Sequence, residues 1–274
     1  MARGPRLGER EPGARARCPP GRTSGPRGGR IAGRGRSAFV DGLVEVAARL
    51  HDAGVAPLLV KTDLDRDFEY SNVDVVVGDD GWDAARTALR GWGREERRYR
   101  LERTKVIVHP PTGTPIHLHR TMSWFDIPLF DTDALRRNAH PSEVAHLLVP
   151  DPADELRTLL AHALFQNLTL DLADLLRLRE TGTPATRATA ASRAATEGWA
   201  DGFAAVLATV DEVMHALDAG RPVSLPAPLE VSVALRGGLE HARHLLRRGQ
   251  GASSLREIGL RGPLVWRKLV RPAR

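Results

Sequence analysis

The stretch EYSNVDVVV, residues 69–77, alternates between polar and apolar side chains as a half-buried β-strand does. Val73, Val75 and Val77 share one face of the expected strand, and Asn72 and Asp74 share the other. The valine face predicts contact with a hydrophobic core. The Asn-x-Asp face is open to two interpretations, a solvated surface or part of a metal site.

Around this strand, the sequence predicts a regular succession of helices and strands. Apolar residues recur at helical spacing before Gly54 and again before Gly93, and short apolar runs bounded by polar links are typical of strands. Pro-Thr-Gly at 111–113 is a turn signal that predicts a hairpin. The expected elements are helices at 38–53 and 79–92 and strands at 57–62, 72–78, 104–110 and 114–120.

Beyond Pro150, the hydrophobic pattern is helical only. Asp151 and Pro152 form a typical helix start, and Gly, Pro or Thr clusters separate the segments that follow. Residues 253–274 show no clear pattern and have a basic end. We expect an α+β protein with a small mixed sheet in residues 37–150 and a helical region in 151–274. The expected helices of that region cover 152–167, 170–182, 199–220 and 228–249.

The first 36 residues carry the basic character of the chain. They contain ten arginines and two glutamates, a net charge of +8, so the remainder carries −2 against a total of +6. This Gly-, Pro- and Arg-rich composition has little to bury and predicts disorder. The segment is either an arginine-rich arm that binds nucleic acid, a solvated leader, or the product of a start codon assigned too early.

Bulk composition limits the class of protein. With 274 residues and 42% hydrophobic side chains, the chain can bury a sizeable core. The single cysteine, Cys18, excludes a disulfide within the chain and a thiolate metal cluster. No apolar run approaches the roughly 18 residues needed to span a bilayer, and no apolar segment follows the basic start as in a signal peptide. We therefore expect a cytoplasmic protein with no membrane partner.

The polar residues follow one another in an order that resembles a known family. Lys61 and Thr62 end the first strand, Asn72 and Asp74 lie on the second, and His117 and His119 lie in IHLH, residues 116–119. His162 and Asp171 follow in the helical region. From about residue 38 to 180 this order resembles the nucleotidyltransferase superfamily, and within it a bacterial group of uncharacterised nucleotidyltransferase-like proteins.

The resemblance implies a nucleoside triphosphate substrate and a Mg²⁺ or Mn²⁺ cofactor. It places Lys61 and Thr62 at the nucleotide, and it makes Asp74, Asn72 and His117 the counterparts of three metal-binding carboxylates that carry the catalysis. Only Asp74 is acidic here, because Asn72 stands for the first aspartate and His117 for the third carboxylate, while Thr62 replaces a glycine. The function implied is transfer of a nucleotidyl group to an unknown acceptor.

The loss of two carboxylates leaves several alternatives open. Acidic residues of the link could restore the missing charge: Asp63, Asp65, Asp67 and Glu69. Asn72, Asp74, His117 and His119 could instead form a mixed nitrogen and oxygen site for manganese or zinc. The scaffold could also bind a nucleotide or a protein partner without catalysis. A further alternative is a nucleic-acid-binding protein that uses residues 1–36.

Three further features of the sequence have two interpretations or a structural one. The segment RTMSWFDIPLF, residues 120–130, either lines an acceptor pocket or covers the core between the two halves. His162 lies among leucines, as a hydrogen-bonded core histidine does. Asp171 and Asp174 either orient elements across the junction or lie in solvent.

Overall fold

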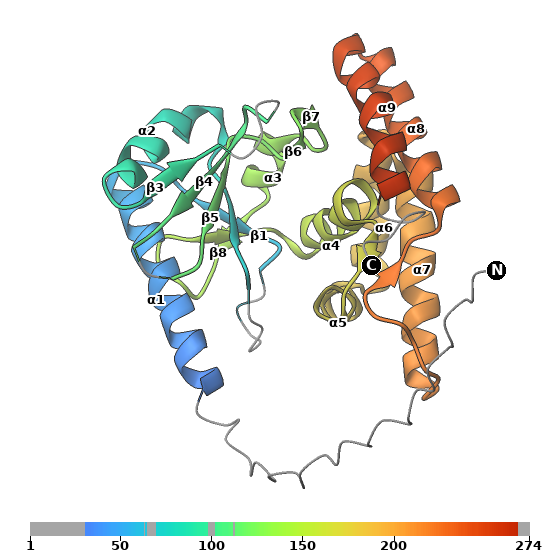
Figure 1. Cartoon of the computed structure of the whole chain (residues 1–274), viewed down its shortest axis with the longest axis horizontal. Helices are drawn as coiled ribbons and strands as arrows, with labels where there is room; N and C mark the ends of the chain where they lie inside the picture. The colour runs from blue at the N-terminus through green and yellow to red at the C-terminus, as the bar shows by residue number, and fades with distance from the viewer. Residues whose placement is uncertain (1–30, 63, 65–69, 98–101, 112, 268–274) are drawn as a thin grey trace, which may run out of the picture.

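The centre of the fold is a mixed β-sheet that confirms the expected α+β class (Figure 1). The computed structural model describes residues 31–62, 64, 70–97, 102–111 and 113–267. Within these residues, seven strands pair in the order β3-β4-β5-β2-β1-β9-β8. Their bounds are β1 Leu58–Val60, β2 Val73–Val76, β3 Arg94–Glu96, β4 Lys105–His109, β5 Ile116–His119, β8 His140–Pro141 and β9 Leu148–Val149.

The four expected strands are present and lie together in the middle of the sheet. β2 runs antiparallel to β1 and parallel to β5, and β4 and β5 form the expected hairpin. The strands β3, β8 and β9 were not expected, because two or three residues are too short to show an alternating pattern.

Two helices cover the face of the sheet that carries Val73, Val75 and Val77. These are α1 (Ile31–Asp52) and α2 (Gly78–Arg90), and their apolar residues join the three valines in one buried cluster. α1 begins seven residues before the expected start, so residues 31–36, assigned to the tail, are helical. Once the apolar stripe between Leu43 and Leu50 is packed, each further helical residue adds a hydrogen bond without a new nucleation cost.

The helical region packs against the opposite face of the sheet. Leu58, Val60 and Val76 from the strands share a second buried cluster with leucines of the C-terminal helices. The helices of this side are α3 Thr132–Arg137, α4 Pro152–Ala161, the π-helical turn η2 His162–Asn167, α5 Leu172–Thr181, α6 Pro184–Thr196, α7 Ala200–Asp218, α8 Val231–Arg247 and α9 Gly251–Val265. A short strand pair, β10 (Thr169–Leu170) and β11 (Ala227–Pro228), ties this region together.

Two helices of this region, α6 and α9, were not expected from the sequence. The Thr-rich segment expected to separate helices is α6, which starts with Thr183 as its cap and Pro184 in its first turn. It was missed because alanines, Ala190 and Ala194, supply its buried stripe in place of larger apolar residues. The segment expected to be an ill-determined end is mostly α9, whose buried residues include charged ones.

The segment 120–130 forms a small hairpin of β6 (Ser123–Trp124) and β7 (Ile127–Pro128). Met122, Trp124, Ile127 and Phe130 are buried in the cluster shared by the sheet and the helical region. The segment therefore covers the core between the two halves, and its last residues, Pro128, Leu129 and Phe130, also line a pocket.

Some predictions lie outside the described residues. These are the character of residues 1–30 and the roles of Asp63, Asp65, Asp67 and Glu69. None of the helices in the described ranges is both long enough and apolar enough to cross a bilayer.

Candidate metal centre

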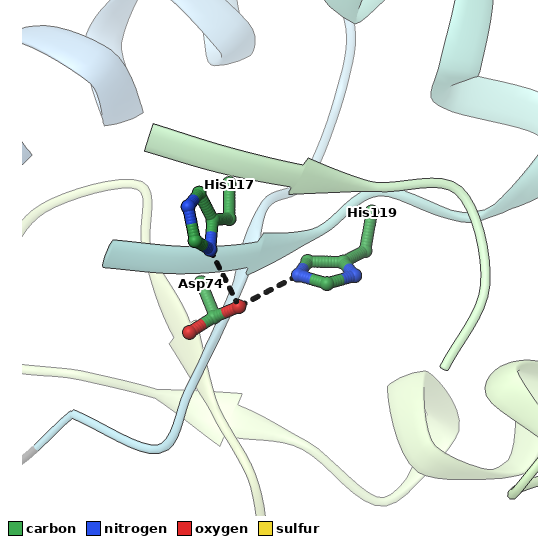
Figure 2. Close-up of side chains that lie close together, drawn as sticks. All are labelled: Asp74, His117 and His119. Carbon is green, nitrogen blue, oxygen red and sulfur yellow. Dashed lines mark hydrogen bonds and ion pairs between the residues drawn. The ribbon is translucent and has the colours of Figure 1, made fainter. Parts of the chain in front are cut away.

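Three side chains with metal-binding atoms converge on the sheet face that meets the helical region. Asp74 lies on β2, and His117 and His119 lie two residues apart on β5. Asp74 and His117 are direct neighbours in the register of these parallel strands, so all three side chains project from the same face. Figure 2 shows both imidazole rings directed at one oxygen of the Asp74 carboxylate.

The geometry of this group is compact. Oδ1 of Asp74 lies 2.7 Å from Nε2 of His119 and 3.5 Å from Nδ1 of His117. One ligand atom from each residue lies within 4.8 Å of the others. His117 is the most accessible of the three, with 18% of its side chain exposed against 7% for Asp74 and 8% for His119. An ion from solvent would therefore approach over the His117 ring.

The second oxygen of Asp74 is held by the other two residues singled out in the sequence. Nζ of Lys61 lies 3.0 Å from Oδ2 of Asp74, and the amide nitrogen of Asn72 donates a hydrogen bond to the same oxygen at 2.9 Å. The hydroxyl of Ser71 donates to the amide oxygen of Asn72. Asn72 thus supports Asp74 as a donor, and its role as a metal ligand stays a prediction.

Lys61 has an unusual backbone conformation. Its φ of 59° lies in the left-handed region, which costs a residue with a side chain roughly 1–2 kcal/mol. Such strain is typical of functional sites, where the surrounding structure enforces it. In this conformation Lys61 reaches Asp74, whereas Thr62 is buried and lines a separate hollow of about 320 Å³. Of the two residues assigned to the nucleotide, Lys61 therefore faces the metal centre and Thr62 faces a different hollow.

The charge states of the group follow from burial and from these contacts. Burial raises the pKa of Asp74, but the Lys61 ammonium and the hydrogen bonds from His117 and His119 outweigh it and hold that pKa well below the usual range. Burial lowers the pKa of His119 to about 4, against the opposing effect of Asp74. At neutral pH the site therefore holds a carboxylate and a neutral imidazole. Ion binding would also require the ring nitrogens that face Asp74 to give up the hydrogens that they donate to it.

Two further carboxylates interact electrostatically with members of the group, Glu102 with His117 and Asp174 with Lys61. Burial raises the pKa of Glu102, opposed by Lys105 and, more weakly, by His117. Burial and Asp171 raise the pKa of Asp174 on α5 to about 6, and Lys61 opposes them. Glu102 was missed in the sequence, since the segment RLERTK that contains it reads like any solvated charged stretch.

The two residues of the helical region in the family resemblance, His162 and Asp171, make different local contacts. His162 begins the π-helical turn η2 and its Nδ1 lies 3.4 Å from the side-chain amide of Asn167. Asp171 caps α5 by accepting a hydrogen bond from the backbone of Asp174 at 2.8 Å. His162 is half-buried, and Asp171 is an exposed helix cap, a role that the sequence analysis did not assign to it.

No protein-family model and no curated protein matches the chain. One carboxylate oxygen and two imidazole nitrogens form the donor set of many Zn²⁺ and Mn²⁺ centres, whereas Mg²⁺ prefers oxygen ligands alone. The residues present fit a transition-metal ion better than magnesium.

Proposed function

We propose that the protein is a nucleotidyltransferase-type protein that binds a nucleoside triphosphate together with Mn²⁺ or Zn²⁺ and transfers its nucleotidyl group to an acceptor. The observation that carries the proposal is the convergence of Asp74, His117 and His119, with ligand atoms within 4.8 Å of one another, on adjacent parallel strands. The order of these residues along the chain is the order that resembles the nucleotidyltransferase superfamily.

The residues of the site have distinct roles in this proposal. Asp74, His117 and His119 hold the ion, which when bound neutralises phosphate charge during transfer. Asn72 orients Asp74 through the hydrogen bond at 2.9 Å. Lys61 now pairs with Asp74, and its ammonium could bind a phosphate oxygen if a bound ion supplied the counter-charge of Asp74.

The proposal is tested by calorimetry with ATP, CTP, GTP and UTP, each in the presence of Mn²⁺, Zn²⁺, Mg²⁺ or a chelator. We expect at least one nucleotide to bind with Mn²⁺ or Zn²⁺ and to bind more weakly with Mg²⁺. Asp74→Asn should weaken this binding by about tenfold or more, the scale on which even supporting residues of metal sites act. Pyrophosphate release on addition of an acceptor would then report transfer.

Asp83→Asn is the matched control, because it makes the same chemical change at an exposed position of α2. It should bind the nucleotide as the wild type does. Failure of every nucleotide to bind with any of the cations would contradict the proposal, and so would an Asp74→Asn variant that binds normally.

One observation favours a second candidate, a nucleotide-binding protein that uses no metal. Lys61 already supplies Asp74 with a cation at 3.0 Å. A Lys61→Met variant separates the two candidates. If the site holds a metal, the variant should bind Zn²⁺ more tightly, since the competing ammonium is gone. If it does not, the variant should lose nucleotide binding and gain no affinity for Zn²⁺.

A further inference from the structure

A second pocket lies between the two halves of the molecule, away from the residues of the metal centre. Its volume is about 520 Å³, within the range of small-molecule sites. It is lined by the end of β7, by α3, and by α4, α6 and α8 of the helical region, and it is open to solvent. Residues from five elements therefore form one concavity at the junction.

The pocket has an apolar wall and a basic wall. Pro128, Leu129, Phe130 and Leu245 supply the first, and Leu129, Phe130 and Leu245 are buried residues. Arg157, Arg193 and Arg248 supply the second. A ligand that fills the pocket would contact hydrocarbon on one side and guanidinium groups on the other.

Two arginines of the basic wall, Arg193 and Arg248, could donate hydrogen bonds to a ligand. Nη1 of Arg193 lies 2.6–2.9 Å from carboxylate oxygens of Asp151 and Asp154. Within the described residues its Nε and Nη2 have no such partner and could meet another acceptor. Arg248 has no ion-pair partner within the described ranges, and it lies on the exposed end of α8. An anionic group is the natural partner for these donors.

Two buried nitrogen atoms of the lining residues also lack partners. Nε of Arg157 and Nδ1 of His241 have no hydrogen bond within the described part of the chain, although both residues are at most 3% exposed. Buried nitrogens are normally paired, so unpaired ones call for an explanation. Both atoms lie beneath the surface of this wall, so the contacts available to a ligand are those of Arg193 and Arg248.

Acidic residues balance two arginines of the basic wall. Arg157 pairs with Asp154 and Glu197, and Arg193 pairs with Asp151 and Asp154. Asp131 is engaged as the cap of α3, where its carboxylate accepts a hydrogen bond from Ala134 at 3.0 Å. Burial raises the pKa of Glu197 to about 7, against the opposing effect of Arg157. The positive charge that stays without a carboxylate partner in the lining, within the described ranges, is therefore that of Arg248.

We propose that this pocket binds a small organic anion, in which a phosphate or carboxylate group is joined to an apolar body of about the size of one ring. The anionic group lies against Arg193 and Arg248, and the apolar body lies against Phe130, Leu129 and Leu245. This site is separate from the metal centre and does not depend on the proposed transfer activity.

The test uses phenyl phosphate and benzoate as probes in calorimetry with the full chain, and phenol and inorganic phosphate as the two halves of the probe. We expect at least one of the two organic anions to bind at millimolar concentration or below, and to bind more tightly than either half. Preference for phenyl phosphate or for benzoate identifies the anionic group that the pocket takes.

Neighbouring arginines provide a matched pair of variants. Arg248→Gln removes a charge from the pocket, and Arg247→Gln removes the same charge from an adjacent exposed position that does not line it. Loss of one charge-assisted hydrogen bond predicts about tenfold weaker binding for Arg248→Gln. Arg247→Gln should bind the probe as the wild type does. Equal losses in the two variants would overturn the proposal, because they would indicate attraction by surface charge alone.

Two further variants place the probe in the molecule. Ala134→Phe fills the pocket from α3 without changing its charge and should abolish binding. Asp74→Asn should leave probe binding unchanged. The proposal is overturned if neither anion binds at millimolar concentration, if Ala134→Phe still binds, or if Asp74→Asn loses the probe, which would then occupy the metal centre.

Discussion

At the scale of single residues, the centre of the site is the buried carboxylate of Asp74, and its neighbours keep that carboxylate ionised. Asp74 is 5% exposed, and four polar contacts from Lys61, Asn72, His117 and His119 hold its carboxylate. A buried carboxylate without such partners would take up a proton. The four contacts therefore keep the buried carboxylate of Asp74 ionised, which is the form that can bind a cation.

The buried histidine of α8 makes the stability of the protein depend on pH. Burial, with Arg261 nearby, lowers the pKa of His241 to about 4, below its ordinary value of 6.5. Because the folded pKa is depressed, the stabilisation is present above pH 6.5 and is lost as the pH falls toward 4. Between pH 7.5 and 5, this residue alone should cost about 2 kcal/mol of unfolding free energy.

Urea denaturation of a His241→Gln variant checks this value, since glutamine keeps a donor and does not titrate in this range. The variant should lose about 2 kcal/mol less than the wild type between the two pH values. His119 shifts in the same direction, so only the difference between variant and wild type is informative. An exposed control, His215→Gln, should follow the wild type. The same pH dependence in His241→Gln and the wild type would contradict the account.

At the scale of elements, α9 is joined to the rest of the helical region by a buried ion pair. Arg261 donates to Glu257 on its own helix and to the backbone oxygens of Leu164 and Phe165 in η2, at 3.1 and 3.4 Å. It also lies over the rings of Trp124 and Phe165. One guanidinium thus holds the last helix, the π-helical turn and the β6-β7 hairpin together.

Removal of the Arg261 guanidinium alone should lower the unfolding free energy far more than removal of both Arg261 and Glu257. Arg261→Met leaves Glu257 buried without its cation and should lower the unfolding free energy by about 3–5 kcal/mol. The double variant Arg261→Met/Glu257→Leu should recover most of that loss, because no uncompensated charge remains. Denaturation of both variants in urea measures the difference. A double variant as unstable as Arg261→Met would show that the contacts to η2 dominate instead.

The elements also show what the sequence could and could not predict. Long periodic segments such as α2 and α7 were predicted, and so were the strands with alternating or apolar runs. The strand face of Asn72 and Asp74 was assigned correctly, and so was the shared face of His117 and His119, because a period of two fixes both. α6 and α9 were missed because alanines and buried charges replace the large apolar residues on which the pattern depends.

The contacts within the site could not be predicted. Strand order brings Asp74 opposite His117, and the left-handed conformation of Lys61 brings its ammonium to the same carboxylate. Neither follows from local pattern, because both depend on which strands pair and on how the chain turns after β1. Nothing in the sequence around Glu102 indicated that it lies near the site.

At the scale of the whole molecule, the sheet and the helical region share one core. Leu58, Val60 and Val76 of the strands are buried in the same cluster as Leu160 of α4 and Phe203 of α7. Separate cores would allow the halves to unfold independently, whereas a shared core couples them. The molecule should therefore unfold in one transition.

Two single-tryptophan variants test this coupling, one that keeps Trp82 of α2 and one that keeps Trp199 of the helical region. In both backgrounds, Leu160→Ala should lower the unfolding free energy by about 2–5 kcal/mol, because it opens a cavity in the shared core. The two tryptophans should report the same shifted midpoint in urea. A shift seen at Trp199 but not at Trp82 would mean that the halves unfold separately.

The central claim is that Asp74, His117 and His119 bind a divalent cation, and Mn²⁺ observed by electron paramagnetic resonance tests it most directly. Titration with the protein should remove the signal of free Mn²⁺ at one ion per chain, and the bound ion should show coupling to imidazole ¹⁴N. His119→Gln and Asp74→Asn should lose both effects, whereas the exposed control His215→Gln should keep them. Mn²⁺ that stays free, or bound Mn²⁺ without ¹⁴N coupling, would contradict the account.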